Sequence, residues 1–288
     1  MAELYLAIDI GGTKLTAGIV DDTGAVVVRD RVPTPTRDVW AALARLVRRV
    51  IAASPEPPIA CGVACGGPVA ADTGHVSPLY IPSWRSFALR ELMEELTGLP
   101  TAVDTDAKAI ASGEAWCGAA VGVTDFIGVC VATGVSGGII SGGRLLQGRS
   151  GNAGNIGHMV VEPNGRECAC GGVGCLDAYC SRVSIEEETG RASQRAPRAI
   201  MERTGTLVGR ALASVAAIVD LRMAVVGGSL ALAFGDVFYD AAQLEVQRRT
   251  GLSHLQGFSI VPVGLGHHAP LVGAAALARY AQRVPTQG

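Results

Sequence analysis

The sequence is short of lysine, of aromatic side chains and of charge of either sign. Only 17% of its 288 residues are charged and 5% are aromatic, the formal net charge is −2, and the only lysines are Lys14 and Lys108. A chain so close to neutral offers no general attraction to nucleic acid or to an anionic membrane surface. We therefore expect neither nucleic acid nor a membrane among its partners.

Long apolar runs are missing as well. The longest apolar stretch, near Leu207–Val226, is interrupted by Arg210, Asp220 and Arg222, whereas a membrane-spanning helix needs about 20 consecutive apolar residues. The first residues do not have the pattern of a secretory signal peptide. The expected location is the cytoplasm, where cysteines stay reduced.

The eight cysteines fall into two groups. Three of them form Cys168-Ala-Cys170-Gly-Gly-Val-Gly-Cys175, downstream of His158. These four side chains supply the ligands of a closed tetrahedral Zn²⁺ site, and the intervening glycines let the backbone turn tightly. Buried free cysteines are the alternative, although i, i+2 spacing in a glycine-rich loop is not typical of a core. Without a fifth ligand nearby, the site is interpreted as structural. The remaining cysteines lie in mostly apolar or glycine-rich surroundings and are expected to be free thiols: Cys61, Cys65, Cys117, Cys130 and Cys180.

Strand patterns and helix patterns alternate along the chain. Strands are predicted at Leu4–Ile10, Leu15–Val20, Ala25–Val32, Ile59–Val63, Thr101–Val103, Asp125–Ala132, Gly137–Ile140 and Ala224–Val226. Helices are predicted at Val39–Ala53, Phe87–Leu96, Asp106–Trp116, Ile200–Val219 and Ala269–Gln282. A strand meander followed by a helix and a strand thus occurs twice, which suggests two related α/β lobes with a cleft between them.

Three glycine-containing turns follow predicted strands and are candidates for nucleotide binding. The first, Asp9-Ile-Gly11-Gly12-Thr13-Lys14, offers backbone N–H groups, a hydroxyl and an ammonium group to phosphate, and Asp9 could hold Mg²⁺. A strand follows it, which argues against a P-loop or a Rossmann fingerprint. The second is Thr133-Gly134-Val135-Ser136-Gly137-Gly138, and the third is Gly227-Gly228, where adenine could lie against bare backbone. Each alone is equally well explained as an ordinary turn.

Asp106 stands near the start of a predicted helix. An acid at that place is commonly an N-cap, or is simply favoured by the helix dipole. In phosphoryl transfer the same side chain could accept the proton of a substrate hydroxyl. The residue and its position leave both interpretations open.

Taken in order, these motifs resemble the ROK family of bacterial sugar kinases and repressors, in the actin-like, hexokinase-like ATPase superfamily. The resemblance covers nearly the whole chain and rests on Asp9–Lys14, Asp106, Thr133–Gly138, Gly151-Asn-Ala-Gly-Asn-Ile-Gly-His158, Cys168–Cys175 and Gly227-Gly228. It implies an α/β, two-lobed fold of ribonuclease-H-like lobes. We expect residues 1–115 to form a small lobe, with a helix at about residues 270–288 packed back on it, and residues 116–269 to form a larger lobe with the zinc loop.

The resemblance also implies the chemistry of the site. ATP and Mg²⁺ would bind between the lobes, Asp106 would be the catalytic base, and the protein would be a homodimer or a dimer of dimers. His158 would bind structural Zn²⁺ through one ring nitrogen while the other faces the sugar. The implied nucleotide contacts are Asp9, Gly11, Gly12, Thr13, Lys14, Thr133, Gly134, Gly227 and Gly228. The implied substrate contacts are Gly67, Tyr80, Thr105, Asp106, Asn155, His158 and Asp177.

Several of these substrate positions depart from the glucokinase pattern. Thr105 and Tyr80 stand where that pattern has Asn, Asn155 and Asp177 stand where it has Glu, and Lys108 also replaces an Asn. A site built to bond particular hydroxyls rejects analogues, because its buried polar groups would otherwise go unpaired. The substitutions therefore predict a preference for something other than plain glucose.

We accordingly expect ATP-dependent phosphorylation of a primary, C6-type hydroxyl on a modified hexose, such as kanosamine, or on a C7-cyclitol. The arginine-rich, lysine-poor composition is typical of actinobacteria, where relatives of this family act on such compounds. An ordinary glucokinase is one alternative and a non-catalytic sugar-sensing ROK protein is another. A DNA-binding repressor is not expected, because the first phosphate motif begins at Asp9 and no basic cluster is present.

Overall fold

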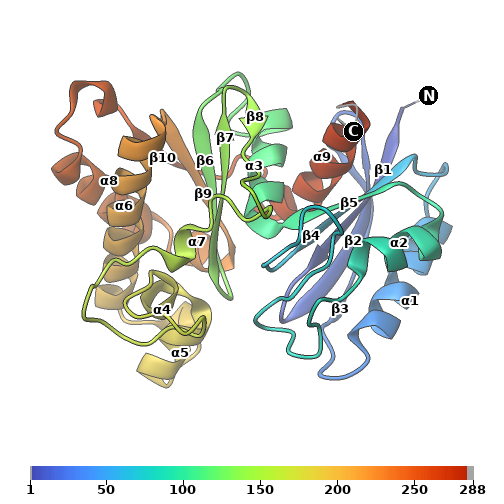
Figure 1. The fold of residues 1–288 in the computed structure, drawn as a ribbon, viewed down its shortest axis with the longest axis horizontal. Helices are drawn as coiled ribbons and strands as arrows, with labels where there is room; N and C mark the ends of the chain where they lie inside the picture. Colours follow the sequence, from blue (N-terminus) through green and yellow to red (C-terminus); the bar gives the residue numbers. More distant parts are fainter. Residues whose placement is uncertain (1, 284–288) are drawn as a thin grey trace. The chain divides into compact units, whose positions relative to one another are not determined.

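The computed structural model describes residues 2–283, and contacts within the chain divide it into two compact units (Figure 1). Of the described residues, unit 1 contains 2–121, the short segment Gln147–Ala153 and 267–283. Unit 2 contains Gly122–Leu146 and Gly154–Gly266. The segment Gln147–Ala153 therefore belongs to unit 1, although the residues on both sides of it belong to unit 2.

A five-stranded sheet in the order β3-β2-β1-β4-β5 forms the centre of unit 1. Its strands are β1 (Leu4–Ile10), β2 (Lys14–Asp21), β3 (Val26–Pro33), β4 (Ala60–Cys65) and β5 (Thr101–Thr105). β1, β2 and β3 are antiparallel neighbours, whereas β4 and β5 continue the sheet parallel to β1. β1 and β4 are almost entirely buried, as their continuous apolar sequences require, while β3 alternates between half-buried and exposed positions at the edge.

Helices cover both faces of this sheet. They are α1 (Val39–Ala52), α2 (Leu89–Thr97), α3 (Asp106–Cys117) and α9 (Ala269–Arg283). The apolar residues of α1 recur at helical spacing and pack into one core with β1 and β4. α9 contacts α3, β1 and β4, and it comes so close that a Cβ on Gly62 of β4 would collide with the carbonyl oxygen of Ala274.

Unit 2 repeats this sheet. Its strands are β6 (Phe126–Val131), β7 (Val135–Ser141), β8 (Arg144–Leu145), β9 (Met223–Gly227) and β10 (Ser259–Pro262). The order β8-β7-β6-β9-β10 again has three antiparallel neighbours followed by two parallel ones. Two units with the same strand order agree with the repeated pattern predicted from the sequence.

The α-helices of unit 2 all follow Cys175, the last of the predicted metal ligands. They are α4 (Asp177–Cys180), α5 (Arg182–Thr189), α6 (Arg198–Val219), α7 (Ser229–Phe234) and α8 (Asp236–Arg249). Short 3₁₀ turns are η1 (Ile156–His158), η2 (Ser193–Arg195), η3 (Ser253–Leu255) and η4 (Gly266–His268), of which the last crosses into unit 1. α6 and α8 pack against each other and contribute to the core under the sheet.

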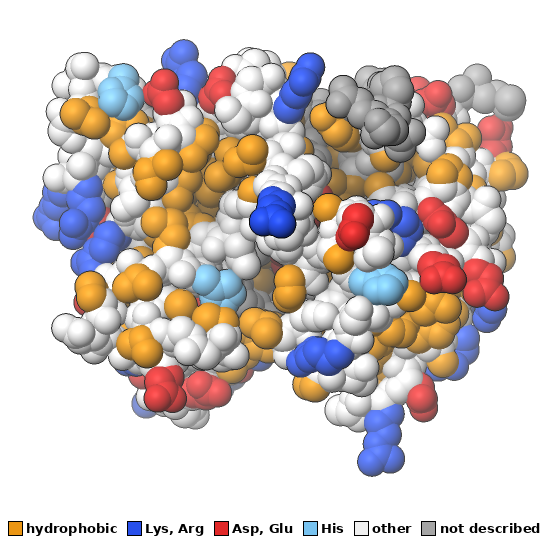
Figure 2. Space-filling model, viewed as in Figure 1, with side chains coloured by type: hydrophobic (Ala, Val, Ile, Leu, Met, Phe, Trp, Pro, Cys, Tyr) orange, Lys and Arg blue, Asp and Glu red, His pale blue; other side chains and the backbone are white. Residues whose placement is uncertain are grey.

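Every strand and helix predicted from the sequence is present, with bounds shifted by a few residues. α4, α5, α7, α8, β8 and β10 are additional. Of the helix expected at about residues 270–288, residues 284–288 lie outside the described part of the chain. No helix formed by residues 2–283 has both the length and the apolar character needed to cross a bilayer. On the face drawn in Figure 2, acidic and basic side chains are interspersed with apolar and neutral ones.

Candidate active site and metal site

Three parallel strands of unit 1 end side by side where two of the predicted functional acids lie. Ile10 of β1 is in register with Cys65 of β4, which is in register with Thr105 of β5. Asp9 comes from the end of β1, and Asp106 begins α3 directly after β5. Ligands in α/β folds commonly bind at such carboxyl ends of parallel strands. The fold thus brings both acids to one edge of the sheet.

The two carboxyl groups influence each other electrostatically. Burial and, next in size, the negative charge of Asp106 raise the pKa of Asp9 from 3.8 to about 7, while Lys14 and Arg29 act in the opposite direction. The N-cap of α3 is Thr105, whose Oγ1 accepts from the Lys108 N–H at 3.4 Å. Asp106 is therefore not the cap. A half-buried carboxyl group with a raised pKa beside a second acid is typical of functional sites.

The turn between β1 and β2 presents the predicted phosphate-binding residues. The N–H of Gly11 donates to the carbonyl of Lys14 at 3.0 Å, and Thr34 fastens the turn to the end of β3. Its N–H donates to Thr13 O at 3.0 Å and its Oγ1 donates to Gly11 O at 2.7 Å. Thr13 and Lys14 are exposed. The turn is thus held rigidly while its hydroxyl and ammonium groups stay accessible.

A second part of the predicted site in unit 1 is built around Gly67. A Cβ at this position would lie 3.3 Å from Thr105 Cγ2 and 3.8 Å from Asn152 Oδ1. Asn152 binds the backbone of Val69 twice, because its Oδ1 accepts from the Val69 N–H at 3.0 Å and its Nδ2 donates to Val69 O at 2.9 Å. The sequence alone does not indicate a role for Asn152. The only signal for it is an amide side chain within a glycine-rich run.

Tyr80 lies in a turn of unit 1 that a single arginine organises. The Nη1 of Arg85 donates to the carbonyl oxygens of Pro78, Ile81 and Trp84, at 3.0, 3.3 and 2.8 Å. Arg85 therefore fixes the backbone on both sides of Tyr80. The role of Tyr80 toward a substrate stays a prediction.

In unit 2 the turn between β6 and β7 carries Thr133 and Gly134. The N–H of Ala132 donates to Gly134 O at 2.9 Å, which closes the turn. The N–H of Val135 donates to Asp177 Oδ1 at 2.6 Å, and Asp177 is only 5% exposed at the start of α4. Asp177 thus helps to hold the predicted phosphate turn, and its contact with a sugar stays a prediction.

The Gly227-Gly228 pair ends β9 and precedes α7. Gly228 has φ of 95°, and a Cβ there would collide with the backbone of Val131 in β6. A Cβ on Gly227 would lie 2.5 Å from Val263 Cγ1. Packing alone therefore requires small residues at this strand end, so the structure accounts for the pair without a bound nucleotide. The predicted contact with adenine stays a prediction.

The four predicted metal ligands meet at one point in unit 2. The ligand atoms of His158, Cys168, Cys170 and Cys175 all lie within 4.8 Å of one another. The distance from His158 Nδ1 to Cys168 Sγ is 3.8 Å, as is that from Cys170 Sγ to Cys175 Sγ. Two thiolates bound tetrahedrally at the usual Zn–S length lie about 3.8 Å apart, so the set fits a zinc ion.

The local chain explains how these ligands converge. His158 ends η1, which starts after Asn155, and its N–H donates to Asn155 O at 3.3 Å. The N–H of Gly172 donates to Cys170 Sγ at 3.4 Å, and this hydrogen bond lowers the pKa of the Cys170 thiol. Cys175 directly precedes the turn into α4. The exposed Asn155 is therefore coupled through the backbone to a candidate metal ligand.

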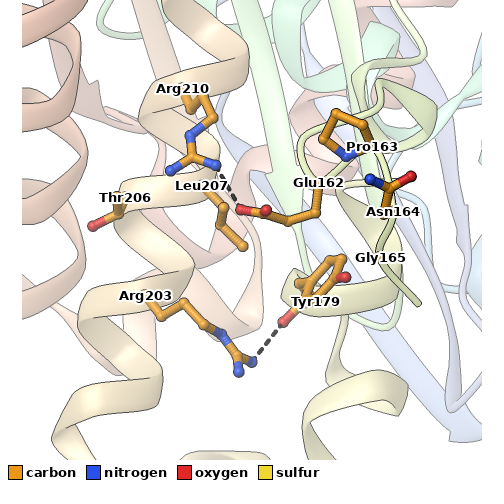
Figure 3. Close-up of a pocket in the computed structure, with 9 residues that line it drawn as sticks. All are labelled: Glu162, Pro163, Asn164, Gly165, Tyr179, Arg203, Thr206, Leu207 and Arg210. Atoms are coloured by element: carbon orange, nitrogen blue, oxygen red, sulfur yellow. Dashed lines mark hydrogen bonds and ion pairs between the residues drawn. The ribbon is translucent and has the colours of Figure 1, made fainter. Parts of the chain in front are cut away.

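A cavity of about 750 Å³ in unit 2 has none of the residues predicted to bind sugar or nucleotide in its lining (Figure 3). It is lined by the loop Glu162–Gly165, by Tyr179 and by α6. Arg210 donates to Glu162 at 2.6 Å and Arg203 to Tyr179 O at 3.3 Å (Figure 3). Arg203 also binds Glu188. The two guanidinium groups are thus already paired.

Comparison with known proteins agrees with this architecture. N-acetylmannosamine kinase of Escherichia fergusonii is 33% identical over 95% of this chain and 98% of its own length. A ROK family glucokinase from Streptomyces griseus, solved with glucose and AMPPNP, superposes with a TM-score of 0.83 at 30% identity, covering 96% of this chain and 99% of that one. For a ROK hexokinase from Thermus thermophilus the TM-score is 0.81 at 31% identity, with coverage of 98% and 99%.

Two sheets of equal strand order with glycine turns at their strand ends define the two-lobed, hexokinase-like class of fold, as expected. Residues 5–281 match the model of the ROK family, and the chain belongs to that family. The class of activity expected from the sequence, ATP-dependent carbohydrate kinase, is confirmed at that level.

Proposed function

We propose that the protein transfers the γ-phosphoryl group of ATP to a primary, C6-type hydroxyl of a hexose-like substrate, with Asp106 as the general base. The observation that carries this proposal is the pairing of Asp106 with Asp9, whose pKa is about 7, at the carboxyl edge of β1, β4 and β5. Phosphoryl transfer needs a proton acceptor for the attacking hydroxyl and strong positive charge near the phosphates. These two acids, with Lys14 close to Asp9, supply groups suited to both tasks.

The two acids have different roles in this mechanism. Asp106 stands in the first turn of α3, where the helix dipole favours the ionised form that a base requires. Asp9 adjoins the Gly11–Lys14 turn and would hold Mg²⁺. The ion would neutralise negative charge on the phosphates and on the Asp9 carboxylate. The N–H groups and hydroxyl of that turn would orient the phosphate chain. Asp106 would then take the proton from the attacking oxygen.

The substrate is proposed to be a modified hexose, such as the aminosugar kanosamine, or a C7-cyclitol, rather than plain glucose. Thr105, next to Gly67, offers a short hydroxyl where the glucokinase pattern has a longer amide. Asp177 has an oxygen committed to the Val135 N–H. The likeness to N-acetylmannosamine kinases supports an aminosugar in particular. We therefore include N-acetylmannosamine among the candidates.

We propose a structural Zn²⁺ at His158, Cys168, Cys170 and Cys175. The supporting observations are the spacing of the four ligand atoms and the burial of Cys168 and Cys175, which are 7% and 3% exposed. Four protein ligands leave no position for a substrate on the ion. Its contribution would be to fix the orientation of His158.

The test is sugar-dependent ADP release by the purified protein, measured as kcat/KM for glucose, kanosamine, N-acetylmannosamine and a C7-cyclitol. A modified sugar is expected to give the highest value. Glucose as the best substrate would make the protein an ordinary glucokinase. Sugar binding in calorimetry without any ADP release would make it a sensor and would refute the proposed activity.

The role of Asp106 is tested separately with Asp106→Asn, which keeps the side-chain shape and removes the proton acceptor. Asp236→Asn is the matched control, because Asp236 likewise begins a helix, α8, and is exposed. Turnover should fall only in the first variant.

A further inference from the structure

Lys108, one of the two lysines of the chain, is completely buried in the first turn of α3. Its Nζ lies 2.6 Å from Gln147 Oε1, 2.6 Å from Gly151 O and 3.4 Å from Asp104 Oδ1. The first two contacts are hydrogen bonds to oxygen acceptors and the third is an ion pair, an arrangement that suits the charged ammonium form of the side chain. Burial opposes both charges, raising the pKa of Asp104 and lowering the pKa of Lys108, and each charge counteracts the shift of the other.

Gln147 completes a closed arrangement with these two side chains. While its Oε1 accepts from Lys108, its Nε2 donates to Asp104 Oδ2 at 3.2 Å. We call Asp104, Lys108, Gln147 and the carbonyl of Gly151 the Lys108 latch. Both acceptors outside the β5–α3 junction come from the segment Gln147–Ala153, which belongs to unit 1 although its neighbours on both sides belong to unit 2. Through the charged side chain of Lys108, the Lys108 latch therefore links that segment to the β5–α3 junction, which carries Asp106.

The same segment carries the group that reaches the predicted sugar positions. Asn152 hydrogen-bonds to both the N–H and the carbonyl oxygen of Val69, and Gly67 lies against both Thr105 and Asn152. The N–H of Ala153 donates to Gln147 O at 3.1 Å, so a hydrogen bond joins the two ends of the segment. A shift at its Lys108 end would therefore be passed to Asn152 and from there to Val69 and Gly67.

We propose that Lys108 is a positioning residue, which sets the place of the segment Gln147–Ala153 against Gly67 and Thr105 and so shapes the sugar-binding surface of unit 1 without touching the sugar. This inference rests on the proposed function. The alternative is that the latch only contributes to stability, as any satisfied buried ion pair can. The two differ in what a substitution does to sugar affinity in a protein that is still folded.

The experiment compares Lys108→Met, which keeps the length of the side chain and removes its donors, with Gln147→Met, which leaves Lys108 paired with Asp104 and Gly151. Val47→Ala is the matched control, since it removes buried volume from α1 in the same unit, away from the latch. Hydrogen exchange of the amides in residues 147–153 is measured together with KM for the best sugar, KM for ATP and kcat.

Both latch variants should raise sugar KM, by about tenfold or more for Lys108→Met, because small misplacements of binding groups are costly. The KM for ATP should change by less than about twofold, and exchange should rise selectively in residues 147–153. Sugar KM unchanged in folded variants, or exchange rising throughout unit 1 as in Val47→Ala, would overturn the proposal. If Lys108→Met fails to fold, Gln147→Met decides.

Failure of the proposed function has a different signature. In that case the unaltered protein releases no ADP with any sugar, while sugar binding by calorimetry and exchange in residues 147–153 still report on the latch. If Lys108→Met and Gln147→Met change neither sugar binding nor hydrogen exchange in residues 147–153, the positioning role of Lys108 is refuted, whatever reaction the protein catalyses.

Discussion

Replacing Asp9 by asparagine should make the protein more stable and inactive at the same time. Burial and the charge of Asp106 raise the pKa of Asp9 from 3.8 to about 7. At about 1.4 kcal/mol for each tenfold change in proton affinity, ionising Asp9 costs the folded protein about 4 kcal/mol. This cost is present at pH 8, where the side chain is charged in both the folded and the unfolded chain. The amide of the Asp9→Asn variant carries no charge, so the substitution would remove the cost.

The sign of the pH dependence follows from the raised pKa. Between about pH 4 and 7 the unfolded chain has lost the Asp9 proton while the folded protein retains it, so this group lowers the free energy of unfolding as the pH rises. Above the folded pKa its contribution is constant. Denaturant unfolding of Mg²⁺-free protein at several pH values should therefore show Asp9→Asn as stabilising at pH 8, by up to about 4 kcal/mol, and much less so at pH 4.

Asp21, at the other end of the same hairpin, provides the control. Burial tends to raise its pKa, but hydrogen bonds from Thr23 and Ala25 outweigh this and lower it. Asp21→Asn should therefore not stabilise the protein at pH 8. An equal effect of Asp9→Asn at pH 4 and pH 8 would contradict the raised pKa, and full kinase activity of Asp9→Asn would remove Asp9 from the site.

Three further outcomes are expected. Metal analysis should find about one zinc per chain, and Cys170→Ser should lose both the metal and stability; an active preparation without zinc would disprove the site. Asp106→Asn should lower turnover at least about a hundredfold with a much smaller change in substrate affinity; near-native turnover would leave Asp106 without a catalytic role. Glucose should be poorer than the best modified sugar by about a hundredfold in kcat/KM; equal values would mean that the residues at Tyr80 and Thr105 do not decide specificity.

The parts of the fold that local pattern determines could be predicted from the sequence. β4 and, apart from Asp9, β1 lack charged residues, and α1 has apolar residues at helical spacing, so their burial follows directly. The convergence of the four candidate metal ligands could be predicted because a short, glycine-rich stretch brings three of them together. Short elements such as α4 and β8 have no such pattern, and α7 follows a glycine pair that indicates only a turn.

Residues of the candidate site could be predicted only where a side chain suited to the reaction lies within a recognisable sequence motif. The sequence left Asp106 as either a cap or a base, and only the backbone identifies Thr105 as the cap. Asn152 and Lys108 act through partners such as Val69 and Gln147, which lie far from them in sequence. Contacts of that separation depend on the whole fold, and a single sequence carries no signal for them.

The burial of Lys108 leaves the chain with one accessible lysine side chain, Lys14, in the turn between β1 and β2. An amine-reactive label should therefore modify the folded protein, among its side chains, at a single place in the predicted phosphate turn. Likewise, a lysine-specific protease would find only one exposed recognition side chain. If nucleotide binds this turn as proposed, protection of Lys14 from labelling would report nucleotide occupancy, and label on Lys108 would report opening of unit 1.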